Sequence, residues 1–121
     1  MIVRFLVLFA LVSLALTSCL GRKPVPEGAS GADIFVLQNC RQCHEDDGSG
    51  SGRAPALGNL RANWTTDQLV LYLFDPAPFI AADARLKKLE DDHSLEMPRY
   101  HNLTEDQRTV LAAWLLDRFG S

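Results

Sequence analysis

Three residues in the N-terminal half have the types and spacing of a covalent cofactor site. Residues 40–44 read Cys-Arg-Gln-Cys-His. Two thiols three positions apart can each add to one vinyl group of the same porphyrin, and an adjacent histidine can reach the iron from the same side. Cys-x-x-Cys-His is the spacing of c-type haem attachment. Cys40 and Cys43 are therefore predicted to hold one haem c covalently, with His44 as an axial ligand of the iron.

Two other uses of paired cysteines fit the sequence less well. A thioredoxin-like dithiol enzyme places its motif in a strand–helix context, but no strand-like pattern precedes Cys40. A structural zinc site takes four ligands, often from a second cysteine pair, whereas the chain has three cysteines in all. The sequence therefore favours haem over a redox dithiol or half of a zinc site.

The segments on either side of the motif are predicted to be helix and loop. Residues 31–39 are largely apolar and predict a short helix that ends at the motif. Residues 45–63 are rich in glycine, serine and aspartate, which is typical of a loop. No strand-like alternation and no internal repeat occurs, so the elements that position the motif are expected to be helical.

Two capping boxes predict where later helices begin. Thr65–Gln68 and Thr104–Gln107 both have a threonine three residues before a glutamine, so that each side chain can accept from the other residue's backbone N–H. The first helix should stop at Asp75, because Pro76 disfavours helical backbone in the residue before it. The second should stop near Gly120.

A further helix is predicted between these two. Apolar residues recur at helical spacing over residues 79–90, at Phe79, Ala82, Leu86 and Leu89.

The order of these features resembles a class I cytochrome c over residues 30–121. The features are a helix, the Cys-x-x-Cys-His motif, a glycine-rich loop, Pro55 and Leu57, a middle helix, Met97-Pro98, and a final helix with Trp114. The resemblance implies an all-α fold, with three to five helices wrapped around one covalently bound haem and the first and last helices crossing.

Met97 is the candidate for the second axial ligand. Apart from Met1 it is the only methionine in the chain, and it precedes the final helix, where the resembling family places its ligand. Pro98 fixes the local backbone, and a soft thioether ligand raises the potential of the haem. His93 and His101 each lie four residues from Met97 and stay open as alternatives, which would give a bis-histidine haem of lower potential.

Other residues are candidates for supporting roles around the haem. Pro55 resembles the family proline whose carbonyl accepts from the ligand histidine and so orients its ring. Arg53, Trp64 and Tyr72 are candidate donors to the haem propionates, although packing alone also accounts for a tryptophan.

The N-terminus has the pattern of an export signal. Arg4 precedes an apolar run over residues 5–16. The run has the length of a signal-peptide core and is shorter than the roughly 20 residues of a membrane-spanning helix. Residues 16–19, Leu-Thr-Ser-Cys, then resemble the lipobox of bacterial lipoproteins. An ordinary secretory signal and an uncleaved anchor stay open as alternatives.

These observations divide the chain into three parts. Residues 1–18 are expected to be a lipoprotein signal peptide, with Cys19 as the lipidated residue. Residues 19–29 are expected to be the lipidated cysteine and a flexible tether, because two prolines and two glycines interrupt any period there. Residues 30–121 are expected to form the cytochrome c domain. One lipidated and two haem-bound cysteines also account for an odd cysteine count.

Composition agrees with one small exported domain. The chain has 121 residues, 47% of them hydrophobic and 22% charged, with a net charge of −3. This length indicates a single domain, and the absence of a basic surplus excludes nucleic acid as the expected partner.

The expected function is electron transfer through one haem c with His44 and Met97 as axial ligands. The chain would be an electron carrier or an electron-transfer subunit of an oxidoreductase complex, not an enzyme by itself. It would lie on the periplasmic or extracytoplasmic side, anchored to a membrane by Cys19, with redox proteins as partners. The alternative is a haem-based sensor or haem enzyme subunit with an open or bis-histidine iron.

Overall fold

The computed structural model describes residues 22–121, which form helices joined by loops, with no strand in this part of the chain. The elements are α1 (Gly31–Leu37), α2 (Cys40–His44), the 3₁₀ turn η1 (Leu60–Ala62), α3 (Thr66–Phe74), α4 (Ala77–Ala82), α5 (Ala84–Asp92) and α6 (Glu105–Phe119). The predicted all-α class is confirmed. The described residues contain six α-helices instead of three to five, because the cysteine motif forms its own turn and the helix predicted over 79–90 is divided.

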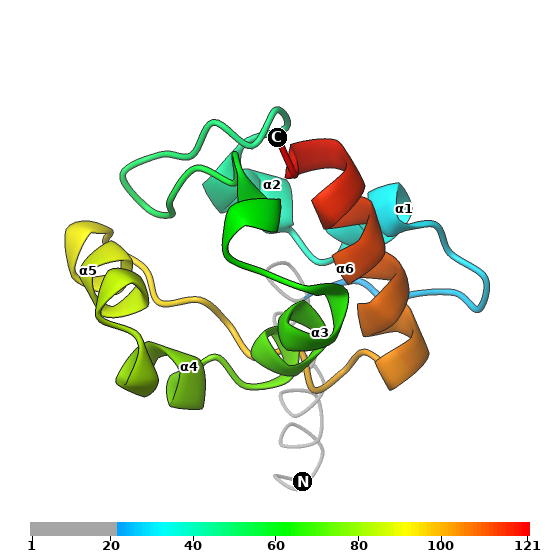
Figure 1. The fold of residues 1–121 in the computed structure, drawn as a ribbon. Helices are drawn as coiled ribbons and strands as arrows, with labels where there is room; N and C mark the ends of the chain where they lie inside the picture. Colours follow the sequence, from blue (N-terminus) through cyan, green and yellow to red (C-terminus); the bar gives the residue numbers. More distant parts are fainter. Residues whose placement is uncertain (1–21) are drawn as a thin grey trace, which may run out of the picture.

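The core forms where α1 packs against α6, the first and last helices (Figure 1). Ile34 and Leu111 are completely buried in this contact. A Cβ atom on Gly31 would lie 2.1 Å from the Cβ of Trp114, so only glycine allows the two helices to approach this closely. Phe35 packs on Trp114 with ring centroids 5.1 Å apart.

Helices α3 and α6 begin at the two predicted capping boxes, and both boxes are confirmed. Thr65 accepts from the N–H of Gln68, and the Gln68 side chain accepts from the N–H of Thr65. Thr104 and Gln107 make the same reciprocal pair at the start of α6. Since α3 packs against α6, these caps fix the ends of two core helices.

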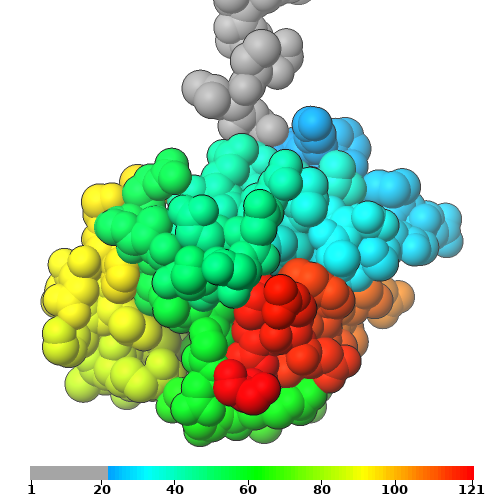
Figure 2. All heavy atoms as spheres, turned by 90° about the horizontal axis from the view of Figure 1, so that it is seen from above, coloured from blue at the N-terminus to red at the C-terminus, as the bar shows by residue number. Residues whose placement is uncertain are grey.

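The helix predicted over residues 79–90 is two helices, α4 and α5, which meet at Asp83. Asp83 has extended backbone (φ −128°, ψ 109°), and its carboxylate accepts from the N–H of Arg85 at 2.8 Å. The aspartate therefore caps a new helix instead of continuing the old one. Figure 1 shows α4 and α5 on the far side of the molecule from α1 and α6, and Figure 2 shows the segment of α5 forming one flank of the surface.

The expectation of a flexible tether over residues 19–29 is wrong for residues 22–29, because they are bonded to the folded domain. The N–H of Lys23 donates to the carbonyl of Leu37 at 3.1 Å, and the Gln38 amide donates to the carbonyl of Lys23 at 3.0 Å. Val25 and Ala29 are partly buried against the core. The prolines remove any helical or strand period, but the apolar side chains and backbone hydrogen bonds still hold this segment against the domain.

The signal peptide expected over residues 1–18 and the lipidation expected at Cys19 lie outside the described residues. Within residues 22–121, no helix is both long enough and apolar enough to cross a membrane.

Candidate functional site

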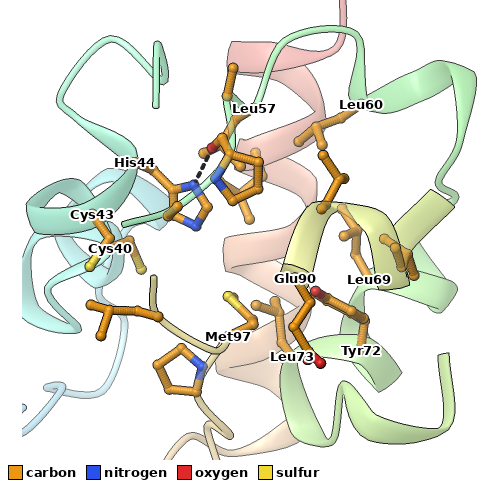
Figure 3. Close-up of a pocket in the computed structure, with 18 of the residues that line it drawn as sticks. Cys40, Cys43, His44, Leu57, Leu60, Leu69, Tyr72, Leu73, Glu90 and Met97 are labelled. Carbon is orange, nitrogen blue, oxygen red and sulfur yellow. Dashed lines mark hydrogen bonds between the residues drawn. The ribbon is translucent and has the colours of Figure 1, made fainter. Parts of the chain in front are cut away.

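The cysteine motif lies at the edge of a cavity of about 350 Å³. Helix α2 follows Asn39, whose φ of 64° is a left-handed conformation that asparagine tolerates. This residue separates α2 from α1 and lets the motif form a separate turn. Cys40, Cys43 and His44 all line the cavity, and Figure 3 shows both sulfur atoms and the imidazole along one wall.

His44 is held in one orientation by Pro55. The Nδ1 atom of His44 lies 2.7 Å from the carbonyl oxygen of Pro55. A carbonyl can only accept, so Nδ1 carries the proton and Nε2 keeps its lone pair for a metal. Burial lowers the pKa of His44, which favours this neutral form. The arrangement suits an iron ligand with an oriented ring.

A tight glycine-rich loop brings Pro55 back to His44. The N–H of Gly50 donates to the carbonyl of His44 at 3.0 Å, and the Ser51 hydroxyl donates to the carbonyl of Cys43 at 2.7 Å. Gly50 has a φ of 78°, and a Cβ atom there would lie 2.5 Å from the backbone nitrogen of Ala56. A residue with a side chain at position 50 would therefore displace the segment that carries Pro55.

Met97 lines the same cavity as His44 and lies in the irregular segment between α5 and α6 (Figure 3). We call residues 93–103 the Met97 loop. Ser94 and Leu95 donate backbone hydrogen bonds to the carbonyls of Gly52 and Arg53, at 3.0 and 3.3 Å. These bonds tie the Met97 loop to the glycine-rich loop that orients His44.

The two competing histidines have other surroundings. Neither His93 nor His101 is among the described residues that line the cavity. The Nδ1 atom of His93 lies 2.6 Å from the carbonyl oxygen of Leu89. The ring of His101 stacks on Phe74, with centroids 4.4 Å apart. Of the three candidates for the second axial ligand, Met97 is the one whose side chain borders the cavity.

The rest of the cavity suits a large apolar ring with a polar edge. Its apolar lining includes Leu57, Leu60, Leu69, Leu73, Leu86, Leu89 and Leu95.

The cysteines and their neighbours do not form a site for a bare metal ion. Burial raises the pKa of Cys40 to about 11, so its thiol is neutral in the folded chain at ordinary pH. Within the described residues, no group of three or more histidine, cysteine, aspartate or glutamate side chains could hold a bare metal ion. The donor set therefore fits a porphyrin and not a zinc site.

Comparison with protein-family models matches the cytochrome c family over residues 28–118, most of the chain. The chain belongs to the cytochrome c family. Members of this family bind haem c covalently and transfer electrons with it. The cofactor of this cytochrome c is therefore haem c, and Cys40, Cys43 and His44 supply its attachment motif. Comparisons with curated proteins and with solved structures found no match.

The structure places all three candidate propionate donors of this cytochrome c, Arg53, Trp64 and Tyr72, at the cavity. Trp64 and Tyr72 pack with ring centroids 4.7 Å apart, and burial raises the pKa of Tyr72 to about 12. In the part of the chain that the structure describes, the Arg53 guanidinium, the Trp64 indole N–H and the Tyr72 hydroxyl donate no hydrogen bond to protein. Trp114, by contrast, packs on Phe35.

Sequence reasoning missed several residues that border the haem cavity of this cytochrome c. Tyr100 is 3% exposed, and its hydroxyl lies 3.9 Å from the sulfur of Cys40. Burial and the neighbouring thiol raise its pKa. Glu90 also lines the cavity, although it belongs to an acidic run that is typical of a solvated face. The signal for Glu90 was its position four residues after Leu86, on the same face of α5.

Arg22 was missed for a different reason. It borders the cavity from a segment that carries no helical or strand period. Its partners in the Met97 loop lie 77 and 80 residues away in the sequence. No local pattern connects residues so far apart.

Proposed function

We propose that this cytochrome c is an electron carrier or an electron-transfer subunit whose haem iron is bound by His44 and Met97. The observation that carries the proposal is that both side chains border one cavity, with the thioether of Met97 in the facing loop. Among residues 22–121, the Nε2 atom of His44 makes no hydrogen bond. The bound haem would supply one-electron chemistry, cycling between Fe(III) and Fe(II). With His44 and Met97 both holding the iron, no ligand position would be left there for a substrate.

The surroundings of the two ligands support this assignment. Pro55 would keep the imidazole of His44 oriented toward the iron. Arg53, Trp64 and Tyr72 are the proposed donors to the propionates, because their polar groups are at the cavity. A thioether ligand favours reduced iron and so a higher potential. The alternative of a bis-histidine iron is weakened because neither His93 nor His101 is among the described residues that line the cavity.

We further propose that the protein acts outside the cytoplasmic membrane, anchored by a lipid on Cys19. The proposal is supported by the lipobox-like residues 16–19. Arg22 contacts the domain directly, so only Leu20 and Gly21 would separate it from the lipidated Cys19. The three Cα–Cα steps from Cys19 to Arg22 span at most about 11 Å. The domain would then stay at the membrane surface, within reach of redox partner proteins there.

Visible absorption of the full chain, produced in a host with haem-attachment machinery, tests the ligation. His44/Met97 ligation predicts a low-spin ferrous spectrum and a weak far-red sulfur-to-iron band in the ferric protein. A low-spin spectrum without that band would move the second ligand to a histidine. Binding of carbon monoxide to the reduced protein would favour a sensor or an enzyme.

Membrane fractionation tests the anchor. Wild type should remain with the membranes and incorporate a labelled fatty acid, whereas Cys19→Ser should be released or left unprocessed without the label. Attachment of haem is the control, since it depends on Cys40 and Cys43 and should be equal in both proteins. Equal labelling of Cys19→Ser and wild type would contradict the proposal.

A further inference from the structure

The first described residues form a strap across the domain. We define the N-terminal strap as residues 22–25. The N–H of Lys23 donates to the carbonyl of Leu37, and its carbonyl accepts from the amide of Gln38. The Gln107 amide donates to the carbonyl of Val25 at 3.4 Å. The backbone of the strap is therefore fixed to the end of α1 and the start of α6.

The side chain of Arg22 reaches from this strap to the Met97 loop. Its Nη1 atom donates to the carbonyl of Arg99 at 2.7 Å and to Oδ1 of Asn102 at 3.0 Å. Its guanidinium carbon lies 4.3 Å from the centroid of the Tyr100 ring, in a cation–π contact. One cationic side chain thus contacts three residues that lie between two and five positions after Met97.

A buried amide links the same residues to the haem-attachment motif. Gln38 is 2% exposed, and its Oε1 accepts from Nδ2 of Asn102 at 2.7 Å. Gln38 comes two residues before Cys40, and the hydroxyl of Tyr100 lies beside the sulfur of Cys40. The strap, the motif and the Met97 loop are therefore parts of one polar network at the edge of the cavity.

We propose that Arg22 is a positioning residue that keeps Met97 at the haem iron by holding residues 99–102 of the Met97 loop. The inference rests on the proposed His44/Met97 ligation. Residues 93–103 contain no helix or strand, so the place of Met97 depends on contacts of this kind. Hydrogen bonds from a charged donor are roughly twice as strong as neutral ones, and Arg22 supplies two of them at the loop.

Displacement of Met97 by imidazole tests the role of Arg22. The ferric full chain with haem attached is titrated with imidazole, and loss of the far-red sulfur-to-iron band gives a dissociation constant. Arg22→Gln should bind imidazole roughly tenfold more tightly than wild type, from the typical worth of charged hydrogen bonds. Lys23→Gln is the matched control, because it removes the same charge one residue away and the Lys23 side chain has no hydrogen bond or ion pair among the described residues.

Each result separates the inference from the proposed function. Absence of the far-red band in wild type would contradict Met97 ligation itself. A band in wild type with the same imidazole affinity in Arg22→Gln would overturn the role of Arg22 alone. Equal tightening in Arg22→Gln and Lys23→Gln would mean that charge, not contact, is responsible, and would also overturn it. If Arg22→Gln does not accumulate, Asn102→Ala removes one acceptor from Arg22 and should change the affinity in the same direction, while an unchanged affinity would contradict the role.

Discussion

The two sides of the cavity are held by contacts of different range. On the His44 side, the hydrogen bond to Pro55 joins residues 11 positions apart, and Gly50 closes the loop between them. On the Met97 side, Tyr100 is bonded through its N–H to Leu73, and the contacts from Arg22 join residues at least 77 positions apart. The orientation of His44 is thus set within a short piece of chain, whereas the Met97 loop also depends on partners from distant parts of the sequence.

This difference predicts which axial ligand is easier to release. Closing a short loop costs little conformational entropy, whereas contacts between distant residues form only when the intervening chain is folded. The His44 side should therefore persist through local opening, while the Met97 loop should be the part whose occupancy at the iron responds to mutation.

The largest effect is expected from disturbing the glycine-rich loop on the His44 side of the cavity, at Gly50. Gly50→Ala places a Cβ atom 2.5 Å from the nitrogen of Ala56 and forces a left-handed φ on alanine. We expect a loss of about 2–3 kcal/mol in the free energy of unfolding, measured by denaturant unfolding of the ferrous protein. Gly52→Ala is the control in the same loop, since a Cβ there meets nothing within 4 Å, and should change stability by less than about 0.5 kcal/mol. Equal losses would show that Gly50 has no special role.

The next largest effect is expected on the Met97 side of the cavity, which depends on contacts from distant residues. Met97→Ala should lower the midpoint potential by more than the ~59 mV that corresponds to tenfold in a one-electron equilibrium, because a soft thioether ligand favours reduced iron. Redox titration measures the change. His101→Ala is the control, because His101 packs on Phe74 and does not line the cavity. A potential unchanged in Met97→Ala, or lowered as much by His101→Ala, would exclude Met97 as the ligand.

The sequence was sufficient to predict the structure and the cofactor wherever the signal lies within a few neighbouring residues. The Cys-x-x-Cys-His motif implied covalent haem, and the chain does belong to the cytochrome c family. The capping boxes at Thr65 and Thr104 each need four residues, and both were predicted at the correct position. The contact of Pro55 with His44 also spans a short loop.

The sequence was insufficient where the partner is distant or where two local signals compete. Arg22 and Gln38 have polar partners 64 to 80 residues away, so the strap was mistaken for a flexible tether. Asp83 lies within an apolar helical spacing, but its capping of α5 prevailed over that spacing and divided the predicted helix. Tyr100 is a single aromatic residue in a polar segment, and nothing near it in sequence marks it as buried.

The smallest effect expected compares the two capping boxes. Thr65→Ala and Thr104→Ala each remove one side-chain cap and should each cost about 1 kcal/mol in the free energy of unfolding. Only Thr104 directly follows the Met97 loop, so only Thr104→Ala should also tighten the binding of imidazole to the ferric protein. Equal stability losses with tighter imidazole binding in Thr104→Ala alone would support the dependence of Met97 on distant contacts. If both variants or neither bound imidazole more tightly, then the start of α6 would not control the Met97 loop. Only the contacts of Arg22 would then distinguish the Met97 side from the His44 side.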